Sequence, residues 1–163
     1  MNLIRIISGG QTGADRAALD VALQLHLDCG GHCPAGRAAE DGPIPPRYPL
    51  QETESDDPAV RTELNVRNSD ATLIISPTSP TPLTPPTPLQ GGTSLTAQLA
   101  AAHGKSCLII DPADSDAVAK ARRWIDEHHI ATLNIAGPRE SESPGIYNDA
   151  IALLLRILRA ETR

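Results

Sequence analysis

The sequence predicts an α/β protein in which helices cover both faces of a mainly parallel sheet. Apolar runs rich in branched side chains alternate along the chain with segments whose apolar residues recur at helical spacing. Glycine occurs in several of the turns that lead from a predicted strand into a predicted helix. The 163 residues can bury a hydrophobic core and fit one domain, expected to span residues 1–163. Alternating strands and helices indicate parallel pairing with right-handed crossovers.

The first predicted elements are a buried strand over residues 3–7, a glycine-rich turn over 8–16 and a helix over 17–25. The turn reads Ser-Gly-Gly-Gln-Thr-Gly-Ala-Asp-Arg, and its glycines permit positive φ angles and close approach of another molecule. The first turn of a helix presents unpaired N–H groups and a partial positive charge, so this stretch predicts an anion site, most often for phosphate. A tight turn with Thr12 or Asp15 as the helix cap explains the same residues equally well.

A short second strand is expected over residues 28–34, followed by a proline-rich loop over 35–50. Charged loops at the carboxyl ends of parallel strands are where such sheets bind ligands. Arg37 could hold a phosphate or carboxylate with two N–H donors, or it could pair with Glu40 or Asp41 and stiffen the loop.

The three cysteines do not form a disulfide framework, because their number is odd and their spacing irregular. Cys107 lies within an apolar run and is expected in the core. Two histidines and two cysteines between residues 26 and 33 are possible zinc ligands by type, but no second pair follows at a matching spacing. No metal site is therefore predicted.

A helix is expected from Pro58, with Arg61 and Asn65 on one face because four positions separate them. A strand over residues 69–76 leads into a segment over 77–90 that contains six prolines and four threonines. This composition excludes a helix or a central strand, so we expect an extended loop that acts as a lid or is a neutral insertion.

The second half of the chain repeats the pattern of strand, glycine turn and helix. Gly91 and Gly92 open a helix that is expected to end at Gly104. A strand over 105–111, a helix to about residue 129 and a strand over 130–136 follow, and a glycine-bearing turn precedes the last helix. Two such turns at one sheet predict a two-sided phosphate cradle.

Composition narrows the classes of function. A net charge of -6, with two tyrosines, one tryptophan and no phenylalanine, argues against a nucleic-acid-binding surface. No apolar stretch reaches the length of a membrane span, and the first residues run into a strand rather than a charged and apolar leader. We therefore expect a cytoplasmic protein that binds neither nucleic acid nor membrane. A homo-oligomer is also expected, because folds of this type commonly leave apolar helix faces exposed.

The glycine turns and their neighbours together resemble a known family. The segments that carry the resemblance are 8–16, 36–45, 61–66, 91–93 and 133–141, and in this order they are similar to the family named "putative molybdenum carrier proteins". Its Rossmann-like superfamily also contains the lysine-decarboxylase-like, cytokinin-activating phosphoribohydrolases. The resemblance covers nearly the whole chain. It implies a three-layer Rossmann-like fold that carries a phosphorylated small molecule, with molybdenum cofactor, a phosphorylated pterin, as the leading ligand.

The expected ligand-binding residues come from these segments. Backbone N–H groups after the two glycine pairs would hold the phosphate, arginines would neutralise charge, and polar side chains would bind the ring. The full set is Gly9, Gly10, Gln11, Thr12, Gly13, Asp15, Arg16, Gly36, Arg37, Glu40, Asp41, Arg61, Asn65, Gly91, Gly92, Thr93, Ser94, Gly137, Arg139 and Glu140.

Two other functions remain open. The first is a nucleoside-monophosphate phosphoribohydrolase, or N-glycosidase, for which Glu40 or Glu140 would supply the catalytic carboxylate. The enzymatic relatives carry Pro-Gly-Gly-x-Gly-Thr-x-x-Glu, and Gln98 stands where their glutamate lies, so a carrier is favoured over an enzyme. The second is a nucleotide-signal sensor whose proline-rich loop docks a partner protein.

Overall fold

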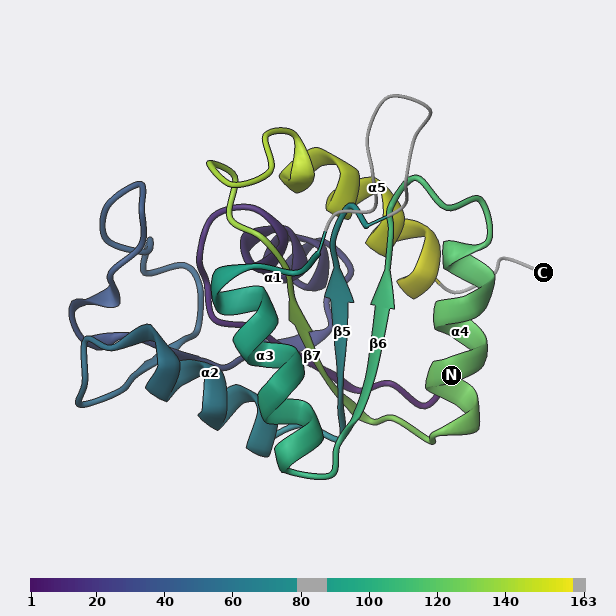
Figure 1. The fold of residues 1–163 in the computed structure, drawn as a ribbon, viewed down its shortest axis with the longest axis horizontal. Coiled ribbons are helices and arrows are strands. Elements are labelled where there is room, and N and C mark those ends of the chain that lie inside the picture. The colour runs from purple at the N-terminus through teal and green to yellow at the C-terminus, as the bar shows by residue number, and fades with distance from the viewer. Residues whose placement is uncertain (79–87, 160–163) are drawn as a thin grey trace.

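A five-stranded sheet forms the centre of the molecule (Figure 1). The computed structural model describes residues 1–78 and 88–159. The strands lie in the order β2-β1-β7-β5-β6, and every neighbouring pair is parallel, which confirms the prediction. Their bounds are β1 (Arg5–Ile7), β2 (Asp28–Gly30), β5 (Ala71–Ile75), β6 (Ser106–Ile110) and β7 (Thr132–Ala136).

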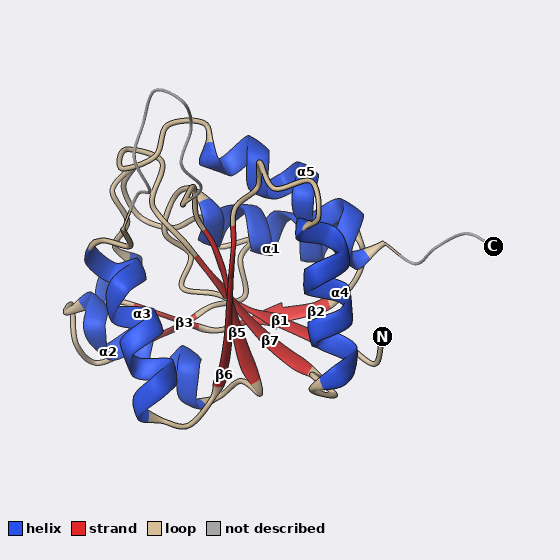
Figure 2. Ribbon diagram, turned by 45° about the vertical axis from the view of Figure 1, so that its right-hand side comes forward, coloured by secondary structure: helices blue, strands red, loops and turns tan. Residues whose placement is uncertain are grey.

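Helices cover both faces of this sheet, as Figure 2 shows. On one face lie α2 (Pro58–Arg67) and α3 (Gly91–Ala102). The other face carries α1 (Ala14–Gln24), α4 (Ala117–Glu127) and α5 (Ile146–Leu158). The molecule therefore has the expected three-layer, Rossmann-like α/β architecture.

The hydrophobic core lies largely between the sheet and the layer of three helices. Leu19 of α1, Leu133 of β7 and Leu154 of α5 are fully buried members of the same cluster. The apolar face of α5 therefore packs on the core, with Leu158 also buried.

The strand that comes last in the chain occupies the middle of the sheet. β7 pairs with β1 on one side and with β5 on the other. Its end packs so tightly that a Cβ at Gly137 would lie 2.3 Å from the carbonyl oxygen of Ile75 and 2.6 Å from the Cβ of Ala14. Only glycine fits this junction between the end of β7, the end of β5 and the start of α1.

The predicted second strand is in fact divided between two sheets. After β2, Gly31 adopts a φ of 126°, and the chain continues as β3 (His32–Cys33), which pairs in parallel with β4 (Gln51–Glu52). No strand was predicted at β4, because two polar residues carry no strand pattern. The side chain of Asn65 holds this small sheet against α2: its Oδ1 accepts from His32 N at 2.8 Å and its Nδ2 donates to His32 O at 3.0 Å.

The start of α1 differs from its prediction, whereas the end of α3 agrees with its prediction. The N-cap of α1 is Gly13, with a φ of 79° and no side-chain cap, so the expectation of Thr12 or Asp15 as the cap is wrong. Gly104 follows α3 with a φ of 63°, as expected for a residue that ends a helix. A single-turn 3-10 helix, η1, spans Ala35–Arg37. Within 1–78 and 88–159, no helix is both long and apolar enough to cross a bilayer.

Much of the predicted extended loop over 77–90 falls on residues 79–87, which lie outside the described residues.

Candidate functional site

A cleft of about 370 Å³ opens at the carboxyl ends of the central strands. This is the edge where open α/β sheets bind ligands. Its walls are the loop after β1, the first turns of α2 and α3, and the end of β7 with the loop that follows. The lining residues are Gly9, Gln11, Asp15, Asp57, Pro58, Ala59, Arg61, Thr62, Asn65, Gly91, Gly92, Thr93, Leu95, Thr96, Asn134, Ile135, Ala136, Gly137, Arg139 and Glu142.

Asp15 is the buried acid of this cleft. Only 8% of the residue is exposed, and burial raises the pKa of its carboxyl group to about 6, although Arg61 and Arg16 oppose the shift. The backbone of Gln11 and of Gly9 hydrogen-bonds to the carboxyl and also lowers its pKa. The glycine turn after β1 therefore wraps around an internal carboxylate.

Arg61 reaches from α2 across the cleft to this turn. Its Nη1 donates to the carbonyl oxygen of Gly9 at 2.8 Å, and a Cβ at Gly9 would lie only 2.6 Å from the same nitrogen. No described residue accepts a hydrogen bond from the other guanidinium nitrogens of Arg61. The guanidinium is thus anchored at one nitrogen and can bind an anion with the others.

The two helices that begin at the cleft differ in their capping. At α2, the Oδ1 of Asp57 accepts from Ala59 N at 3.0 Å. At α3, the N-cap Gln90 makes no side-chain capping bond. Among the described residues, none would lie within 4 Å of a Cβ at Gly92. The N-terminus of α3 therefore presents N–H groups and partial positive charge to the cleft.

Comparison with known proteins assigns the chain to a family and gives a related crystal structure. Residues 6–158 match the family described as the circularly permutated YpsA SLOG family. The chain belongs to this family. A crystal structure of a "putative molybdenum carrier protein" from Syntrophus aciditrophicus SB is 45% identical to it, covers 97% of this chain and 96% of its own, and superposes with a TM-score of 0.87. The resemblance seen in the glycine turns is therefore confirmed. No curated protein matches the chain significantly.

In this member of the YpsA SLOG family, part of the expected ligand-binding set gathers at the cleft and part lies elsewhere. Those that line it are Gly9, Gln11, Asp15, Arg61, Asn65, Gly91, Gly92, Thr93, Gly137 and Arg139. Those that do not are Gly10, Thr12, Gly13, Arg16, Gly36, Arg37, Glu40, Asp41, Ser94 and Glu140.

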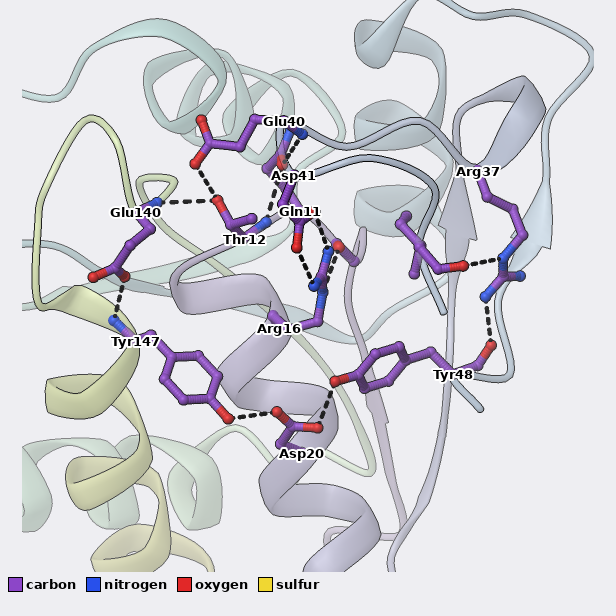
Figure 3. A network of polar contacts seen from close by, with 12 residues as sticks. Gln11, Thr12, Arg16, Asp20, Arg37, Glu40, Asp41, Tyr48, Glu140 and Tyr147 are labelled. Atoms are coloured by element: carbon purple, nitrogen blue, oxygen red, sulfur yellow. Dashed lines mark hydrogen bonds and ion pairs between the residues drawn. The ribbon is translucent and has the colours of Figure 1, made fainter. Parts of the chain in front are cut away.

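Arg37 organises the proline-rich loop from within (Figure 3). Its guanidinium donates to the carbonyl oxygens of Ile44 at 2.9 Å, Pro45 at 2.9 Å, Tyr48 at 2.9 Å and Leu50 at 3.2 Å. Neither of the alternatives considered for Arg37, a bound anion or a pair with Glu40 or Asp41, describes these contacts. Asp41 pairs instead with Arg16, whose Nη1 lies 3.0 Å from its Oδ2.

The two carboxylates considered for catalysis join neighbouring loops (Figure 3). Glu40 accepts hydrogen bonds from the hydroxyls of Ser141 and Thr12. These bonds, the one from Ser141 most of all, keep the pKa of Glu40 below its usual value. Glu140 accepts from the backbone N–H groups of Gly145 and, at 3.0 Å, Tyr147, at the start of α5.

Sequence reasoning missed several lining residues. These are Asp57, Pro58, Ala59, Thr62, Leu95, Thr96, Asn134, Ile135, Ala136 and Glu142. Asn134 did carry a signal, because it is a polar residue between the apolar Leu133 and Ile135 of a predicted strand. In the structure only 3% of it is exposed. A polar side chain at such a position needs a partner or a role in a site.

Proposed function

We propose that the protein binds a phosphorylated small molecule in the cleft and carries it without converting it, with molybdenum cofactor as the leading ligand. The observation that carries the proposal is the N-terminus of α3, which lines the cleft and whose N-cap residue, Gln90, makes no side-chain capping bond to a described residue. The name of the Syntrophus aciditrophicus relative supports the choice of ligand.

The chemistry of the walls suits a phosphate. Backbone N–H groups at Gly91 and Gly92 add to the positive end of the α3 dipole, and Arg61 supplies a fixed positive charge from α2. A volume of about 370 Å³ lies within the range of small-molecule sites.

Binding is favoured over hydrolysis by the placement of the candidate catalytic groups. Glu40 and Glu140 are engaged by hydroxyl and backbone donors away from the cleft. Gln98, which stands at the catalytic position of the enzymatic relatives, is exposed on α3 and donates to the hydroxyl of Ser94 at 3.1 Å. A general base for cleaving an N-glycosidic bond would have to come from another residue.

Gly92→Val tests the proposal. The new side chain would project into the space assigned to the phosphate, while nothing in the described structure stands within 4 Å of its Cβ. We expect the affinity for nucleoside monophosphates and for 6-hydroxymethylpterin monophosphate, measured by calorimetry, to fall at least about tenfold, since several anion contacts are lost. The melting temperature should change little.

Ala102→Val is the matched control, because it adds the same side chain at the exposed far end of α3. It should leave both affinity and melting temperature unchanged. Undiminished binding by Gly92→Val, or the absence of binding by every phosphorylated probe, contradicts the proposal.

A further inference from the structure

Three parts of the cleft lining are related to three neighbouring strands of the sheet. The α3 terminus follows β5, Asp15 follows β1, and β7 lies between these two strands in the sheet. The start of α3 and Asp15 both line the cleft, and its volume of about 370 Å³ suits one ligand with a phosphate at one end and a heterocycle at the other.

Asp15 differs from the other acids of the cleft. Asp57 and Glu142 are exposed and already engaged, with Ala59 N and the guanidinium of Arg139. Asp15 is the buried carboxylate among the described lining residues, and the backbone of Gly9 and Gln11 fixes its orientation. A carboxylate only accepts hydrogen bonds and has about four lone-pair positions, so two neighbouring donors of a ligand can still be received.

Asn134 lies on the middle strand, between these two walls. Its Nδ2 donates to the hydroxyl of Thr72 at 3.2 Å, and this bond fixes the amide. Its Oδ1 accepts from no described residue, yet no side-chain oxygen of the described part is both fully buried and unsatisfied. The Oδ1 is therefore open to the cleft and can accept a hydroxyl of the group that links ring and phosphate.

We propose that the cleft selects ligands whose ring presents two adjacent N–H donors to Asp15, as the 2-amino-4-oxo edge of pterins and guanine does, while Asn134 accepts from the linking group and α3 holds the phosphate. This inference rests on the proposed function and adds the class of ring to it. Adenine presents a ring nitrogen beside its amino group. The lone pair of this nitrogen would face the carboxylate oxygen, and two acceptors repel each other.

The wild-type protein tests the inference with a series of ring edges. Calorimetry at pH 7.5 compares GMP, with both donors, IMP, which lacks the amino group, and AMP, which lacks the N–H at the same place. We expect GMP to bind roughly 10- to 100-fold more tightly than AMP, with IMP between them, as for other two-pronged contacts to a base edge. Equal affinities, or tighter binding of AMP, overturn the inference.

The same series separates the two sources of this edge. If 6-hydroxymethylpterin monophosphate binds more tightly than GMP, the site is built for a pterin. If GMP binds more tightly, the site is built for a guanine nucleotide. Provided that GMP binds more tightly than AMP, both results support an Asp15 edge.

Asp15→Asn tests the residue itself, because an amide offers one acceptor and one donor. We expect the ratio of GMP to AMP affinities to fall to about threefold or less, with the melting temperature confirming a folded protein. Asp57→Asn, which removes the same charge from the same cleft and keeps a capping oxygen, should preserve the wild-type ratio. An unchanged ratio in Asp15→Asn overturns the inference.

If Asp15→Asn does not fold, the wild-type series alone decides. If all phosphorylated probes bind equally and Gly92→Val abolishes their binding, the ring selectivity fails while the proposed function stands. If no probe binds, the proposed function fails as well.

Discussion

At the scale of single residues, Asp15 combines a cost in stability with a place in the cleft. Burial raises its pKa from 3.8 to about 6, so ionising it at neutral pH disfavours the folded state by about 3 kcal/mol. Arg61 and Arg16 offset part of the burial effect but do not cancel it. Perturbed carboxylates of this kind cluster at functional sites.

The pH dependence of stability checks this cost. Between about pH 4 and pH 6 the folded chain keeps the proton on Asp15 while the unfolded chain has lost it, so the stability from this group is lost as the pH rises through 6. Asp15→Asn has no such proton. We therefore expect the variant's free energy of unfolding, relative to wild type, to rise by up to about 3 kcal/mol from pH 4 to pH 7. Urea denaturation at each pH measures it, and a constant difference contradicts the raised pKa.

At the scale of elements, the apolar strands and the glycine turns are the parts that sequence reasoning can find. β5 and β7 are recognisable because buried parallel strands are rich in branched apolar residues. β4 was not predicted, and β3 was not separated from β2, because strands of two residues have no periodicity.

The same limit explains how much of the site could be predicted. The turns at Gly9 and Gly91 point to the edge of the sheet where the cleft lies, because a glycine turn after a strand is a local feature. The contacts of Arg37 with four backbone carbonyl oxygens depend on how the following loop folds back. Every residue has a backbone carbonyl, so the sequence gives no signal for such contacts. Asn134 needed the sheet order before its position at the cleft became apparent.

The start of α5 provides a prediction about one element. Glu140 satisfies the N–H groups of Gly145 and Tyr147, so Glu140→Ala leaves both without their acceptor and removes a negative charge from the positive end of the helix. We expect a loss of about 1–2 kcal/mol in unfolding free energy and faster hydrogen exchange in the first turn of α5.

The control for this change is Glu142→Ala. Glu142 is exposed and pairs with Arg139 at 2.8 Å on the surface, so its loss should cost less than about 0.5 kcal/mol. Equal effects of the two substitutions would mean that Glu140 does not cap α5.

At the scale of the whole molecule, the order of the strands ties both ends of the chain together. β1 and β5 do not pair with each other, and β7 joins them from between. Among the described strands, the two halves of the main sheet, β2-β1 and β5-β6, are therefore hydrogen-bonded to each other only through β7, which lies late in the chain. The cleft has the same dependence, since its floor contains Asn134 and its wall includes the loop after β7.

A fragment of residues 1–129 should therefore fail to fold, although it contains four of the five strands of the main sheet. Without β7, β1–β2 and β5–β6 remain as separate pairs with exposed edges, and two-stranded units are not stable alone. We expect no cooperative urea transition by circular dichroism for this fragment. Addition of a peptide of residues 130–163 should restore the transition, because β7 can pair with both halves and α5 can cover α1. A cooperative, wild-type-like transition of the fragment alone would show that the two halves of the sheet associate without their central strand.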